Sequence, residues 1–135
     1  LLGDTMHLLQ VESELEEIVK LVGYDSLSAP DRLSLEAARS IREDYLQQNA
    51  FDGVDTYTSL PKQYGMLKMV LHFYYEAKAA LESGVAVERI FALPVRDKIA
   101  RMKYVEEKDV QTYLATTTTE LENSMKELMS GEVSA

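Results

Sequence analysis

Two aromatic residues, Phe51 and Tyr57, occur in a stretch whose composition is otherwise typical of a polar loop. The stretch reads IREDYLQQNAFDGVDTY (residues 41–57) and leads from a charged amphipathic helix into Asn, Asp and Gly residues. A ring left in water forgoes about 1.5–3 kcal/mol of burial free energy, so both rings should pack against something. The edge of the protein's own core could receive them, and so could a flat ligand or a partner subunit. Aromatic loop residues held by a rigid helical scaffold often form binding sites.

Other residue patterns that support catalysis or metal binding are scarce. His72 and Glu76 are one helical turn apart and could share a metal ion, but the paired Glu-x-x-His motifs of a di-iron bundle are missing. Aromatic and aliphatic residues flank His72, which favours a packed or hydrogen-bonded histidine. The chain has no cysteine, no nucleophile–base motif, and no glycine that begins a phosphate-binding G-x-x-x-x-G-K-[ST] run. We therefore predict neither a metal site nor a catalytic residue in this chain.

Length and charge exclude several classes of protein. The 135 residues suit one domain, and 23 acidic against 14 basic residues give a net charge of −9. This balance argues against nucleic acid and against adsorption to anionic lipid. The apolar runs are too short for a membrane span, and no secretory signal is recognisable. A cytoplasmic domain without direct membrane insertion is expected. The apolar start without Met suggests a fragment whose residues 1–5 are a leader, either linker or vector remnant.

Hydrophobic periodicity predicts an all-α fold, an antiparallel helical bundle with short loops. Leu8, Val11, Leu15, Ile18 and Val22 form one helical stripe, and Ser28-Ala29-Pro30-Asp31 has the composition of a helix start. The bundle should span residues 6–129, with a disordered tail at 130–135 and fraying or a bend at Thr116–Thr119. Helices are expected at about residues 6–22, 29–48, 59–84, 87–92, 94–102 and 107–129.

Three long motifs carry a resemblance to a known family. They are IREDYLQQNAFDGVDTY, LPKQYGMLKMVLHFYYEA and LPVRDKIARMKY. Together they resemble the C-terminal helical domain of the catalytic A subunit of archaeal and vacuolar-type (A/V-type) rotary ATPases. The resemblance extends from about Met6 over nearly the whole chain. The nucleotide-binding core of that family, with its phosphate loop and catalytic glutamate, would lie upstream.

The resemblance implies two functional segments, and a more distant similarity to the β subunit of F-type ATP synthase supports both. Phe51 matches the ring that stacks on adenine, although this chain has one extra residue before it. The implied adenine-side residues are Ala50, Phe51, Val54 and Tyr57. The implied rotor-contact loop consists of Tyr24, Asp25, Ser26, Leu27, Ser28, Ala29, Pro30 and Asp31. Ser26, Ala29 and Pro30 replace three glutamates of the β subunit, so contact by shape and apolar packing is expected.

The helix from Ala29 to Gln48 joins these two segments directly. At 1.5 Å per residue it would be a rigid lever of roughly 30 Å, with a charged face that includes Glu36, Arg39, Arg42 and Glu43. The resemblance implies ATP or ADP with Mg²⁺ in the intact subunit, coupled to proton or sodium transport. Implied partners are the B subunit of the catalytic ring and the central-stalk rotor subunits, in the cytoplasmic, peripheral part of a membrane complex. Two alternatives are a self-contained helical interaction module without catalysis and a metal-dependent helical enzyme.

Overall fold

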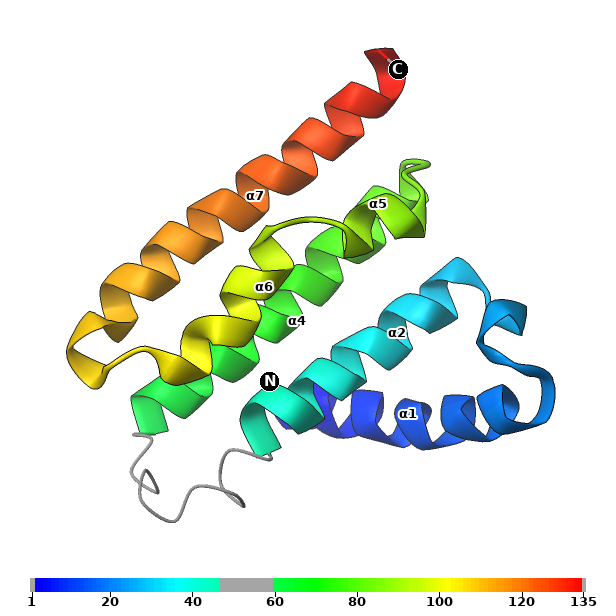
Figure 1. Cartoon of the computed structure of the whole chain (residues 1–135), viewed down its shortest axis with the longest axis horizontal. Coiled ribbons are helices and arrows are strands. Elements are labelled where there is room, and N and C mark those ends of the chain that lie inside the picture. The colour runs from blue at the N-terminus through cyan, green and yellow to red at the C-terminus, as the bar shows by residue number, and fades with distance from the viewer. Residues whose placement is uncertain (1, 47–59, 135) are drawn as a thin grey trace.

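The computed structural model describes residues 2–46 and 60–134 of the chain. Within these ranges it contains six α-helices and no strand, which confirms the all-α prediction. Consecutive long elements alternate in direction: α1 lies below α2 at an angle to it, and α4 runs back beside α2 on its other side (Figure 1). The α5–α6 segment returns between α4 and α7. The helices are α1 (Leu2–Val22), α2 (Ala29–Ser40), α4 (Leu60–Glu82), α5 (Val87–Phe91), α6 (Val95–Ala100) and α7 (Val110–Ser134).

The helix ends follow local signals in the sequence. Gly23 and Gly84 adopt positive φ angles of 93° and 103° directly after α1 and near the end of α4, a conformation that costs glycine little. Ser28 caps α2, because its hydroxyl oxygen accepts a hydrogen bond from the amide of Asp31 at 3.3 Å. Pro94 separates α5 from α6, as expected from its incompatibility with a continuous helix.

Four short helical segments complete the described chain. Three are 3₁₀ turns at Tyr24–Ser26, Arg101–Tyr104 and Glu107–Asp109. The fourth is a π-helical segment, Ile41–Leu46, which continues α2 without a break. Helical backbone thus extends from Ala29 to Leu46, most of the length predicted for the lever.

Two apolar clusters hold the hairpin formed by α1 and α2. The main core joins α1 and α2 to the remaining helices through residues such as Leu8, Leu33, Ile41, Leu71 and Leu121. A smaller cluster of Leu15, Leu27 and Leu35 lies between α1 and α2 alone, with Val11, Val19 and Tyr24 packed against it. The hairpin therefore has its own core near the turn and shares the main core at its other end.

Two residues of the predicted stripe on α1 are exposed instead of facing the core. Ile18 and Val22 are 41% and 66% exposed, because the C-terminal end of α1 extends beyond α4 and packs against α2 and the turn that precedes it (Figure 1). Periodicity identified the helices correctly, but it could not show where a neighbouring helix ends.

The terminal helices are longer than predicted. α1 begins at Leu2, so residues 2–5 of the expected leader are helical, and α7 includes residues 130–134, for which disorder was expected. α7 is also continuous through Thr116–Thr119. There Thr117 is buried, and the Thr119 hydroxyl donates to the carbonyl of Ala115 at 3.1 Å. Tertiary packing thus outweighs the modest helix propensity of threonine.

No helix of the described ranges is both long and apolar enough to cross a membrane.

Candidate functional site

Of the two functional segments predicted from the sequence, the structure describes only the rotor-contact loop. Ala50, Phe51, Val54 and Tyr57 lie outside the described residues, so the adenine-side assignment stays a prediction. The rotor-contact loop, Tyr24–Asp31, is described completely and forms the turn of the α1–α2 hairpin (Figure 1). We call Gly23–Asp31 the tip. The tip and the end of the π-helical segment lie at opposite ends of the α2 rod, whose 18 residues span roughly 27 Å at 1.5 Å each.

Short-range hydrogen bonds shape the tip. The hydroxyl of Ser26 donates to the carbonyl of Gly23 at 2.6 Å, and the amide of Leu27 donates to the carbonyl of Tyr24 at 3.0 Å. The Ser28 cap then starts α2, with Pro30 in its first turn. The side chains of Asp25, Ser26 and Pro30 remain exposed. The tip is therefore an ordered turn with a small polar surface.

Leu27 is not available for contact with a partner. Its side chain is buried between α1 and α2 beside Leu15 and Leu35. Leu27 belongs to the implied rotor-contact loop, so an apolar contact there would have to come from other side chains. Tyr24 is half-buried on the same cluster, and burial, followed by the nearby Glu36 carboxylate, raises the pKa of its phenol.

An apolar surface that the sequence analysis missed lies directly before the tip. Leu21 and Val22 are 81% and 66% exposed, and Ile18 lies one turn earlier on α1. Ile18 and Val22 belong to the predicted core stripe, whereas Leu21 lies off it. The adjacent apolar pair Leu21-Val22 was the available signal, because two consecutive helical residues cannot both face one narrow core stripe. We call Ile18, Leu21 and Val22 the apolar end of α1.

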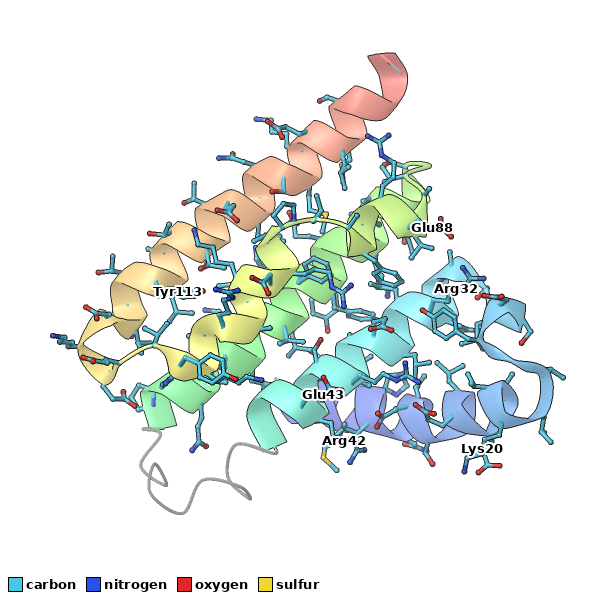
Figure 2. The ribbon with its side chains drawn as sticks, in the orientation of Figure 1. Lys20, Arg32, Arg42, Glu43, Glu88 and Tyr113 are labelled. Carbon is cyan, nitrogen blue, oxygen red and sulfur yellow. The ribbon has the colours of Figure 1, made fainter. Side chains whose placement is uncertain are left out.

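Ion pairs tie the charged face of α2 to its neighbours. Arg39 contacts Glu16 of α1 at 3.0 Å, and Arg96 of α6 contacts Glu36 at 3.4 Å. Arg42, in the π-helical segment, contacts Glu12 at 2.6 Å. The Glu12 side chain is only 7% exposed, and Arg42 donates to it through both Nε and Nη2. Much of this charged face is thus engaged in ion pairs within the domain, while Glu43 beside Arg42 is exposed (Figure 2).

Arg32 connects the tip to α5. Its guanidinium donates to the carbonyl of Asp25 at 3.1 Å and to a carboxylate oxygen of Glu88 at 3.3 Å, and it lies over the ring of Tyr24 with 5.4 Å to the centroid. Arg32 and Glu88 approach each other from α2 and α5 in Figure 2. They line an open groove of about 570 Å³ between the start of α2 and the turn from α4 to α5.

His72 lies beside Glu122 of α7, whereas the sequence suggested Glu76 as its neighbour. Its Nε2 lies 3.3 Å from a carboxylate oxygen of Glu122 on α7, outside the geometry of a good hydrogen bond. In the part of the chain that the structure describes, no three His, Cys, Asp or Glu side chains converge in a way that could hold a metal ion.

The described chain is an all-α domain in which a helical hairpin with an ordered tip packs on further helices. The family described as the C-terminal domain of V and A type ATP synthase matches residues 2–91, and the chain belongs to this family. The chain is 58% identical over 131 residues to the V-type ATP synthase alpha chain of Acetivibrio thermocellus, which covers 97% of this chain and 22% of that protein.

Two further relatives agree. The V-type ATP synthase alpha chain of Clostridium perfringens is 55% identical over 127 residues, 94% of this chain and 21% of that protein. The V-type ATP synthase alpha chain 1 of Clostridium tetani is 65% identical over 105 residues, 78% of this chain and 18% of that protein. The chain thus spans about a fifth of the length of these relatives.

Proposed function

We propose that this chain is the helical domain through which the catalytic subunit of a rotary ATPase contacts the rotor. The intact subunit would make or hydrolyse ATP, with Mg²⁺, coupled to proton or sodium transport. It would alternate with B subunits in the catalytic ring and belong to the cytoplasmic, peripheral part of the complex. This domain would supply the rotor contact at the tip and the adenine-side loop around Phe51.

The α1–α2 hairpin is the observation that carries this proposal. It extends beyond α4, has its own small core, and ends in a tip that is flanked by exposed apolar side chains. A solvated apolar group such as Leu21 gains about 1.5–3 kcal/mol when a partner covers it fully. The apolar end of α1 therefore supplies the packing surface that Leu27 cannot.

The same geometry supports contact by shape rather than by charge. The tip holds Asp25 and Asp31 but not the acidic run of the β subunit of F-type ATP synthase. Apolar contacts are not screened by salt, whereas exposed charge pairs are. Binding between the tip and the central stalk should therefore change little with ionic strength.

Crosslinking tests the proposal directly. Ser26→Cys or Ala29→Cys in the intact subunit should form disulfides with a cysteine on the central-stalk subunit, and rotation should stop until the disulfide is reduced. Glu127→Cys on α7, an exposed position remote from the tip in the sequence, is the matched control and should not crosslink to the stalk. Crosslinks from the tip that reach only ring or membrane subunits would contradict the rotor assignment.

A further inference from the structure

We propose that Arg32 is the positioning residue that fixes the tip to α2 and α5, so that a push on the tip moves the helices instead of deforming the turn. The inference rests on the proposed rotor contact, which it deepens by naming the residue that transmits load. Arg32 itself lies in the first turn of α2, directly after the tip.

Leu27 anchors the tip through its side chain, and Arg32 adds a hydrogen bond to the backbone of the turn. Gly23 joins α1 to the turn with φ of 93°, and glycine has more backbone freedom than any other residue. The hydrogen bonds of Ser26 and Leu27 described above close the turn on itself, but they do not attach it to α2. The bond from Arg32 to the Asp25 carbonyl spans seven residues and does attach it.

Arg32 makes three contacts in three directions. One arm donates to the Asp25 carbonyl, the other donates to Glu88, and the guanidinium plane lies near the Tyr24 ring. The Arg32 side chain is 20% exposed, whereas that of Glu88 is 72% exposed. Arg32 is thus held in place over the turn, and the bond to Glu88 carries the contact across the groove to α5.

Arginine suits this position better than lysine. Its planar fork can donate to two acceptors in different directions and stack on a ring at the same time, whereas an ammonium group is a single point charge. Arg32→Lys would keep the positive charge near Glu88 but lose the simultaneous bond to the turn. Arg32→Gln would remove the charge and the fork together.

The test compares ion transport with ATP hydrolysis in the reconstituted complex. A potential-sensitive dye in the vesicles reports uptake of either proton or sodium, and phosphate release reports hydrolysis. We expect both Arg32→Gln and Arg32→Lys to lose transport per ATP hydrolysed while hydrolysis continues, because a loosened turn lets the catalytic cycle proceed without turning the shaft. Glu88→Gln, which leaves the tip and α2 untouched, should show a smaller loss in the same direction.

Lys20→Gln is the matched control. Lys20 is a basic residue at the same end of the hairpin, 72% exposed, with Glu17 at 3.9 Å as its ion-pair partner. Its transport ratio should equal that of the unmodified complex. An unchanged ratio in Arg32→Gln, or full recovery in Arg32→Lys, would overturn the assignment of Arg32. Thermal unfolding of each assembled variant shows whether a lower transport ratio comes from misfolding. If the Arg32 variants misfold, the transport ratio of Glu88→Gln tests the assignment instead, and an unchanged ratio there would overturn it.

The crosslink from Ser26→Cys, made with Arg32 in place, separates this inference from the proposed function. If Ser26→Cys reaches the stalk and Arg32→Gln keeps the normal ratio, the rotor contact stands and the role of Arg32 is wrong. If Ser26→Cys does not reach the stalk, the rotor contact and the role of Arg32 are both wrong.

Discussion

Leu21 and Leu27 lie six residues apart on either side of the hairpin turn and have opposite surroundings. Leu21 is 81% exposed on α1, whereas Leu27 is 6% exposed between Leu15 and Leu35. The buried side chain of Leu27 stabilises the hairpin, whereas the exposed side chain of Leu21 contributes little to folding. Under the proposed rotor contact, Leu21 is a side chain that the partner would cover.

Truncation of each leucine to alanine should separate these roles. Leu27→Ala removes buried side-chain atoms and should lower the free energy of unfolding by about 2–4 kcal/mol. Leu21→Ala, the matched control, should change it by less than about 0.5 kcal/mol. Urea denaturation of the isolated chain measures both. Equal losses in the two variants would show that Leu21 is packed in solution.

For single residues, the sequence predicted local backbone features better than it predicted tertiary contacts. The helix start at Ser28 could be assigned because N-capping depends on local backbone chemistry. The burial of Leu27 could not, because it depends on how α1 and α2 close on each other over the turn. The contacts of Arg32 could not be predicted either, since its partners Asp25 and Glu88 are seven and 56 residues away in the sequence.

At the scale of elements, the π-helical segment Ile41–Leu46 ends four residues before Ala50, the first of the adenine-side residues that the resemblance implies. π-helical turns are uncommon and are often found at functional sites. Arg42 lies in this segment and pairs with the buried carboxylate of Glu12. The pair thus ties the far end of the rod to α1, just as Leu27 ties the near end.

Removing Arg42 should therefore weaken the hairpin more than removing an exposed cation. Arg42→Met leaves the Glu12 carboxylate buried without its bidentate partner, and since Arg42 itself is half exposed, we expect a loss of about 1–2 kcal/mol. Lys20→Met, which breaks only an exposed pair, should cost less than about 0.5 kcal/mol. Urea denaturation at low and moderate salt measures both losses. If Arg42→Met were as mild as Lys20→Met, the Glu12 pair would contribute nothing to the hairpin.

The helices themselves were predictable because their apolar periodicity is strong. α2, α4, α5 and α6 begin within a few residues of the predicted positions, and the break at Pro94 was foreseen. The start of α1 and the end of α7 were not, since no capping signal marks these two positions in the sequence. The π-helical geometry of Ile41–Leu46 was not either, because hydrophobic periodicity over six residues does not distinguish it from an α-helix.

For the whole molecule, the two proposed contact segments flank one helical rod in the sequence. Ala29 begins the rod beside the tip, and Leu46 ends it five residues before Phe51. The described part of the chain contains no metal-holding cluster, and the sequence contains no phosphate-binding motif. Phosphoryl transfer needs positioned cations at the phosphates, so we expect the isolated chain neither to hold a bound nucleotide nor to hydrolyse ATP.

Phe51→Ala in the intact subunit tests the nucleotide end of the rod. A ring stacked on adenine contributes equally to the ground state and the transition state, so its loss should raise the KM for nucleotide and leave kcat nearly unchanged. The expected loss is about 1–2 kcal/mol, the scale of base–aromatic stacking. Steady-state kinetics of ATP hydrolysis measure the KM and kcat of the variant and the unmodified complex.

Phe91→Ala provides the matched control for the same residue type. Phe91 packs against the main core and lies near Arg96, with 5.0 Å from the guanidinium carbon to the ring centroid. Its loss should lower the melting temperature without raising the KM. If Phe51→Ala behaved like Phe91→Ala, with a lower melting temperature and an unchanged KM, Phe51 would be a packing residue of the bundle. The rod would then connect the rotor contact to some other part of the catalytic subunit.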